Sequence, residues 1–359
     1  MKAFFLNSML VADLATGTLV RQPLPEKALK AGDLSVIAEL FPEDVVIVAG
    51  RLSGSYAPSA SVLTLYAEGK GAIVKGQSAP ALRRCGLDAV VLKGRAGSAC
   101  GLVLDEKRAA FVPADASAEV PALRSALVRE AKLLRGSYAD TQSACVITGP
   151  AAFLGAASPA LAVDPGLAPR TAEMAHALAT RKVVGLCFNG GLPFLSPVPL
   201  DDTCRTSAKV ERLTSSSLAP LIKVAKPDFT GKVPSVVGRS VACYGCTAPC
   251  GFWMPAKEGH VASTGIMGLA ALCEAGATDE RIAAVLSLAC RYGLDPEGLA
   301  ALAKGDLPDS LAACVEACAA VPAMDMELDI VRKGTFLGVC PFYLKRFPEA
   351  LKHLEKYQA

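Results

Sequence analysis

The first part of the chain consists of short apolar runs separated by turn residues. The runs at 44–49 and 88–92 are rich in Val, Ile and Leu, and each is followed by glycine or lysine-glycine. Short runs of this kind, closed by turn residues, are typical of strands. Apolar residues spaced by three or four positions predict helices over 117–134 and 172–179. Further strands are expected at 10–14, 18–20, 61–66, 100–104, 109–112, 146–147 and 183–188.

Helical spacing dominates the second part of the chain. Helices are expected at 213–224, 266–274, 279–292, 296–303, 311–321 and 342–357. Thr278, Asp295 and Ser310 stand where helix-capping residues are expected. A β-rich part followed by a helical part predicts an α+β fold. We therefore expect a β-rich domain at 1–205 and a helical domain at 206–359.

Composition excludes several classes of protein. Of the 359 residues 52% are hydrophobic and 6% aromatic, and the net charge is only +3. A small charge and few aromatic residues argue against nucleic acid as a partner. No run of 18 apolar residues predicts a membrane span. The apolar run at 1–6 is short and is followed by Asn7 and Asp13, so it predicts a first strand rather than a secretion signal.

Thirteen cysteines are many for a chain of this size. Their odd number and scattered spacing do not fit a disulfide scaffold, so a reducing, cytoplasmic location is expected. Cys314 and Cys318 lie in an alanine-rich segment, where a buried apolar role is the expected one. The clustered cysteines instead indicate a metal site.

Three cysteines form a C-x2-C-x3-C motif at Cys243, Cys246 and Cys250. Such short spacing lets one loop present several soft thiolates to one centre, and both iron–sulfur clusters and zinc accept thiolates. Cys340 is the best candidate for a fourth ligand, because it follows a glycine by two residues and directly precedes a proline. Spacing alone favours iron–sulfur but leaves zinc open.

Several stretches, in order along the chain, resemble one family. They are residues 10–17, 49–58, 85–96 and 148–151, the C-x2-C-x3-C motif, and residues 338–340. Together they resemble the tungstopterin-containing aldehyde:ferredoxin oxidoreductases, in which the first stretch reads "VDLTTG" and the last "GLC". The matches run nearly from end to end. This common order is more specific than any one motif.

The resemblance implies a structure and a chemistry. In that family a β-rich N-terminal domain forms a base under the pterin, and helical domains cover it. Four cysteines, here Cys243, Cys246, Cys250 and Cys340, would hold one [4Fe–4S] cluster that passes electrons to ferredoxin. An anaerobic redox system is the implied setting. The resemblance leaves homo-oligomers and hetero-oligomers both open.

The departures from the family concern the pterin site. Two aspartates of its pterin signatures are replaced by Cys290 and Thr335, which cannot accept the pterin N–H groups as a carboxylate does. Glycine-rich or acidic family motifs are also missing at 30–35, 175–184 and 263–267. The chain is shorter than the family's, and the region with the catalytic histidine is missing. These losses argue against tungstopterin and leave no catalytic residue to assign.

Three hypotheses follow. The first is an electron-transfer or scaffold subunit that keeps the [4Fe–4S] cluster and works beside a redox partner, either ferredoxin or a larger oxidoreductase complex. The second is an active tungsten enzyme that oxidises aldehydes to acids with ferredoxin as acceptor, its site completed by a partner. The third is a structural zinc protein. Tyr244, Phe252 and Trp253 are candidate docking contacts near the cysteines, or else the apolar lining of the site.

Overall fold

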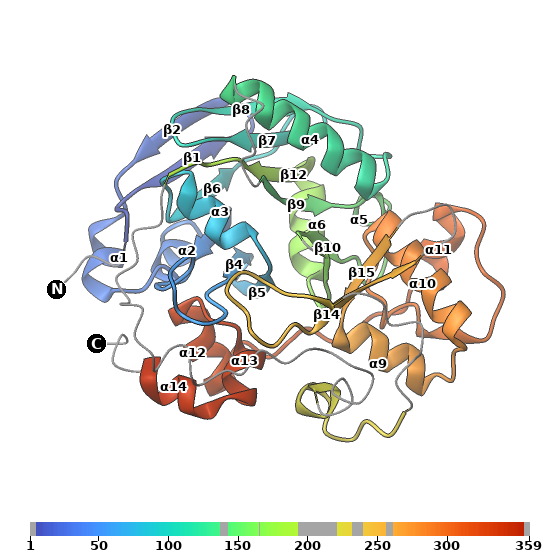
Figure 1. The fold of residues 1–359 in the computed structure, drawn as a ribbon. Coiled ribbons are helices and arrows are strands. Elements are labelled where there is room, and N and C mark those ends of the chain that lie inside the picture. The colour runs from blue at the N-terminus through green and yellow to red at the C-terminus, as the bar shows by residue number, and fades with distance from the viewer. Residues whose placement is uncertain are drawn as a thin grey trace.

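The computed structural model describes residues 5–136, 143–164, 166–192, 221–231, 240–255 and 261–354. These residues form the α+β fold that the sequence predicts. Two six-stranded sheets stand side by side and the later helices lie beneath and beside them (Figure 1).

The first sheet has the strand order β2-β1-β6-β3-β4-β5. β1 and β6 are parallel, whereas the other neighbours run antiparallel. β5 is therefore an edge strand, and its last residue is Lys75. The strands are β1 (Met9–Asp13), β2 (Thr18–Gln22), β3 (Val45–Ala49), β4 (Val62–Ala67), β5 (Lys70–Lys75) and β6 (Ala89–Lys93).

The second sheet has the order β11-β10-β9-β12-β7-β8. Here only β12 and β7 run parallel. The strands are β7 (Cys100–Leu104), β8 (Ala109–Pro113), β9 (Ala144–Thr148), β10 (Leu161–Val163), β11 (Gly166–Ala168) and β12 (Val183–Phe188).

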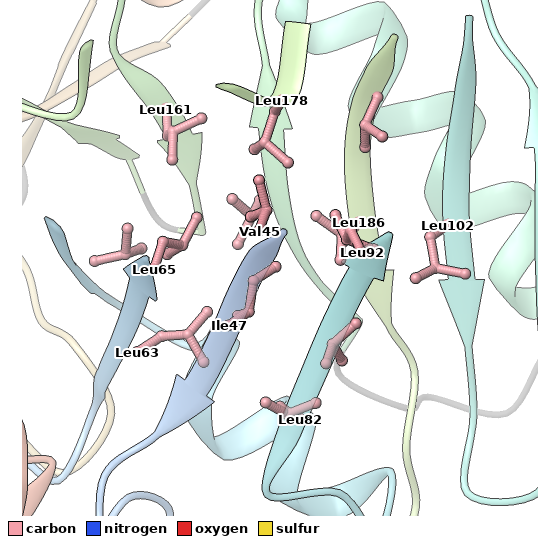
Figure 2. Close-up of a cluster of buried hydrophobic side chains, with 14 of the residues drawn as sticks. Val45, Ile47, Leu63, Leu65, Leu82, Leu92, Leu102, Leu161, Leu178 and Leu186 are labelled. Carbon is pink, nitrogen blue, oxygen red and sulfur yellow. The ribbon is translucent and has the colours of Figure 1, made fainter. Parts of the chain in front are cut away.

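The largest core lies between the two sheets. Successive strand residues face opposite sides, so Val45 and Ile47 of β3 join this core with Leu186 of β12 (Figure 2). Val46 and Val48 face the other way, toward the short helices on the outer side. The two helices α3 (Ser78–Arg84) and α6 (Ala172–Thr180) contribute to the core between the sheets.

Helices cover the outer faces of both sheets. α1 (Glu26–Ala31) and α2 (Val36–Leu40) pack against the first sheet. The amphipathic helix α4 (Val120–Arg135) packs on the second sheet and is capped by Gly136, so it ends close to the predicted end at residue 134. A short helix, α5 (Pro150–Phe153), follows β9. In this arrangement β5 is at the edge of the first sheet, and a later part of the chain is hydrogen-bonded directly after its end.

The later residues form a small sheet and a set of helices. The three-stranded sheet has the order β13-β14-β15. Its strands are β13 (Ser240–Val241), β14 (Gly251–Pro255) and β15 (Val261–Gly265), and the helices are α9 (Ile266–Glu274), α10 (Asp279–Tyr292), α11 (Leu311–Ala317), α12 (Asp329–Leu337), α13 (Pro341–Arg346) and α14 (Pro348–Leu354), with a 3-10 turn, η2, at Ala300–Ala303.

Several predicted elements differ from the structure. The helix expected over 342–357 is broken into α13 and α14, because Pro348 cannot donate to a helix and disfavours helical backbone before it. The helix predicted over 311–321 ends at Ala317. Of the helix predicted over 296–303, only residues 300–303 are helical, as η2. The first strand begins at Met9, so Phe5 and Leu6 lie outside it. Residues 1–4 and 213–220 of the predictions lie outside the described part.

A buried ion pair joins α3 to the start of β6. Arg83 pairs with Asp88, and its other guanidinium nitrogen donates to the Gly50 carbonyl at 3.0 Å. We expect Arg83→Met to lower the free energy of unfolding by about 3–5 kcal/mol, because Asp88 would keep a buried, uncompensated charge. Arg129→Met, which removes an exposed pair with Glu130, should cost less than about 1 kcal/mol in the same denaturant titration. Equal costs would contradict this assignment.

Candidate metal centre

The three clustered cysteines lie on one loop between β13 and β14. The Cys246 N–H donates to the Cys243 carbonyl at 3.1 Å, which closes a tight turn. Gly245 in this turn has a φ of +63°, a conformation that glycine adopts without steric cost. The Tyr244 N–H donates to the Gly76 carbonyl at 3.1 Å, so the loop is fastened directly after β5.

Cys340 approaches from the junction of α12 and α13. It is 4% exposed, and its N–H donates to the Ser59 carbonyl at 3.1 Å. Gly338, with a φ of +76°, ends α12 and turns the chain toward Cys340. The Gly338 carbonyl accepts from the Val62 N–H at 3.1 Å. The segment before β4 therefore holds the distant cysteine in place.

Two glycines allow this junction to pack backbone against backbone. A Cβ atom on Gly50 would lie 2.3 Å from Gly338 Cα, a distance that no side-chain movement can relieve. We expect Gly50→Ala to displace the end of α12, to cost about 3 kcal/mol or more of folding free energy, and to lower the metal content of the purified chain. Gly97→Ala is the matched control, since nothing lies within 4 Å of its added Cβ. An unchanged metal content in Gly50→Ala would refute this role.

The four predicted ligands come close enough to affect one another's ionisation. Burial, and next the charges of Cys250, Cys246 and Cys340, raise the pKa of the Cys243 thiol well above its usual range. Burial likewise raises the pKa of Cys246 to about 12, with Cys250 and Cys340 adding to the rise. Burial also raises the pKa of Cys250, so the three thiols of the loop stay protonated unless a cation compensates their charge, and a bound metal does so.

The four cysteines do not form a preformed site for a single ion. Within the described ranges, no three or more Cys, His, Asp or Glu side chains are grouped so as to hold one metal ion. A zinc ion draws four ligands into one tetrahedron, whereas a cluster receives one thiolate at each of its irons.

Lys75 brings a positive charge to the thiols. The charge of Cys340, and then that of Cys250, Cys243 and Cys246, raises the pKa of Lys75, so its ammonium stays protonated. In the part of the chain that the structure describes, no carboxylate lies within ion-pair distance of Lys75. An ammonium group in this setting calls for a negative partner.

A cavity of about 300 Å³ adjoins two of the cysteines. Cys243, Cys250 and Lys75 line one part, and most of the remaining lining is apolar, with Phe342 and Arg170 among it. This volume is at the lower end of the range of about 300–1,000 Å³ for small-molecule sites.

The positions of the family's pterin carboxylates do not offer the same groups here. Thr335 lies in the last turn of α12 with its hydroxyl buried and without a hydrogen-bond partner, and Cys290 packs beside an apolar cluster. Asp295 remains, but its carboxylate accepts from the N–H of Arg170 at 2.8 Å and that of Glu297 at 2.9 Å. Burial raises the pKa of Asp295 to about 6. Neither Cys290 nor Thr335 therefore presents the carboxylate that the resemblance assigns to pterin recognition.

Other sequence-based candidates have different outcomes. Phe252 is fully buried and cannot be a docking contact, whereas Trp253 is 41% exposed. Burial raises the pKa of the Tyr244 hydroxyl, which lies near Arg84 and Tyr56. Cys314 and Cys318 are buried in an apolar cluster, as predicted. His260 lies outside the described residues.

Sequence reasoning missed Lys75 and Ser59. Lys75 ends a strand that begins with Lys70-Gly71, residues with little strand preference, so the strand itself was not predicted. A lysine closing the apolar run 72–74 was the available signal. Ser59 has a φ of +56°, which nothing in its sequence context indicates.

No helix in the described ranges is both long and apolar enough to cross a membrane. No protein-family model and no curated protein matches the chain. A solved structure described as "Active site complex BamBC of Benzoyl Coenzyme A reductase in complex with 1,5 Dienoyl-CoA" matches with a TM-score of 0.63 at 14% identity, covering 97% of this chain and 64% of that one. The chain thus spans just under two thirds of that protein's length and shares its fold.

Proposed function

We propose that this chain is an iron–sulfur electron-transfer or scaffold subunit, in which Cys243, Cys246, Cys250 and Cys340 hold one [4Fe–4S] cluster. The observation that carries the proposal is the partly buried ammonium of Lys75, whose charge interacts with all four thiols and which has no carboxylate within ion-pair distance among the described residues. A cluster bound by four thiolates is anionic, and Lys75 would neutralise part of its charge.

The donor set fits such a group. All four proposed ligands are soft sulfurs, the donor type that iron–sulfur clusters take. Burial of Cys340 and partial burial of the other three protect the site from solvent. When bound, a cluster accepts and releases one electron at a time. The protein's part is to hold the sulfurs, exclude water and supply the counter-charge.

The fold likeness supports a place in a larger redox assembly. The matching structure is described as a complex of two named parts of benzoyl-coenzyme A reductase. A chain that carries a cluster but lacks the carboxylates for a pterin would exchange electrons with a partner, either ferredoxin or a larger oxidoreductase subunit. Because Cys290, Thr335 and the occupied Asp295 do not fit tungstopterin, we assign this chain no catalytic step of its own.

The test measures reduction and reoxidation of the anaerobically purified protein by visible absorption. Dithionite should bleach a broad visible absorption, and oxidised ferredoxin or a viologen dye should restore it. Aldehydes added with viologen should give no turnover. Aldehyde-dependent viologen reduction by the purified chain, with tungsten present, would instead establish the enzyme alternative. An absorption that dithionite leaves unchanged, or no visible absorption, would favour structural zinc.

A further inference from the structure

Ser59 lies where the two halves of the cysteine set meet. Its N–H donates to the Gly245 carbonyl at 3.0 Å, inside the C-x2-C-x3-C loop. Its own carbonyl accepts from the Cys340 N–H at 3.1 Å. One residue therefore joins a loop and a helix start that are about 90 positions apart in the sequence.

The conformation of Ser59 is unusual. Its φ is +56°, in the left-handed region that residues other than glycine avoid. Such conformations persist when the surrounding structure fixes them, and they concentrate at functional sites. Here the two main-chain hydrogen bonds hold the residue, and glycine would satisfy both without strain. A serine at this position, where glycine would be unstrained, therefore indicates that the side chain has a role.

The Ser59 hydroxyl is the part of the side chain that can have such a role. Ser59 is 1% exposed, and its Oγ is buried without a hydrogen-bond partner among the described residues. The neighbouring thiol is that of Cys246, since the Ser59 N–H is bonded to the carbonyl of Gly245, the residue directly before it, and the Ser59 side chain lowers the pKa of the Cys246 thiol against the larger effect of burial. A buried, unsatisfied donor beside a metal-binding sulfur is expected to form a hydrogen bond when that sulfur carries charge.

We propose that Ser59 is a positioning residue of the metal centre, whose hydroxyl donates a hydrogen bond to the Cys246 sulfur once this sulfur is a metal-bound thiolate. The inference rests on the proposed iron–sulfur function. Hydrogen bonds to cluster sulfurs stabilise the more negative, reduced state and raise its reduction potential. Ser59 is thereby assigned to setting the potential of the centre.

The test uses two variants that remove the hydroxyl in different ways. Ser59→Ala keeps the Cβ, whereas Ser59→Gly also relieves the backbone strain, so folding is retained in at least one of them. Anaerobic redox titration of the full chain measures the midpoint potential. We expect both variants to keep their iron and to disfavour the reduced form by about three- to tenfold, tenfold being 59 mV for a one-electron couple.

The control is another buried serine of the same loop. The Ser55 Oγ accepts from the Ala57 N–H at 3.1 Å and does not contribute to the raised pKa of Cys243, Cys246 or Cys250. Ser55→Ala should titrate at the wild-type potential. Wild-type potentials in both Ser59 variants would overturn the inference and leave the cluster assignment intact. Absence of iron from the wild-type chain would overturn the cluster assignment itself.

Discussion

Cys340→Ala is expected to abolish the intact four-iron centre. The other three ligands share one loop, whereas Cys340 comes from the junction of α12 and α13 and is the one ligand from a distant part of the chain. Iron should fall from about four per chain to about three or fewer, with loss of most visible absorption. Iron analysis and absorption spectra of anaerobically purified protein measure the change.

Cys318→Ala is the matched control. Cys318 is also a buried cysteine of the C-terminal part, 5% exposed; it packs in an apolar cluster, and its charge does not act on the pKa of Cys243, Cys246 or Cys250. This substitution should cost about 1 kcal/mol of stability and leave iron unchanged. If Cys340→Ala kept full iron, or both variants lost it equally, Cys340 would not be a ligand.

Lys75→Met is expected to act in opposite directions on the loaded and the metal-free chain. With the cluster bound, loss of the ammonium leaves the negative centre uncompensated in a low-dielectric site. The midpoint potential should fall by about 60 mV or more, a tenfold change in the reduction equilibrium. Without metal, the raised pKa values keep Cys243 and Cys246 protonated, and Lys75 is then a partly buried cation without an ion-pair partner in the described part of the chain. Its removal should stabilise the metal-free chain by about 1 kcal/mol or more.

Lys70→Met tests whether the effect belongs to the site. Lys70 begins the same strand but is 65% exposed and pairs with Glu173 at 3.7 Å. Its replacement should change neither the potential nor the metal-free stability by a measurable amount. A Lys75→Met chain with an unaltered potential would contradict the role of Lys75 as the counter-charge of the centre.

Much of the fold follows from local patterns. Buried strands such as β3 and β12 are continuous apolar runs, and α10 begins at the cap Thr278 as predicted, its hydroxyl accepting from the Arg281 N–H at 3.3 Å. β5 was missed because glycine and lysine open it, and its strand conformation comes from pairing with β4. The small β13–β15 sheet was not predicted either, and its outer strands β13 and β15 each pair with β14.

The candidate site was predictable to the extent that its chemistry is local. Three cysteines within eight positions point to a metal, and the distant Cys340 follows from its glycine and proline neighbours. Lys75 and Ser59 could not be found in this way. Their significance comes from tertiary contacts, namely the arrival of four thiols at the end of β5 and two main-chain bonds that meet at one residue.

The central claim is that the four cysteines hold one iron–sulfur cluster and that the chain carries no tungsten. Iron, acid-labile sulfide, zinc and tungsten measured on the same anaerobically purified sample test it most directly. The account predicts about four iron and about four sulfide per chain with neither zinc nor tungsten in stoichiometric amount. About one zinc per chain without labile sulfide, or stoichiometric tungsten, would contradict it.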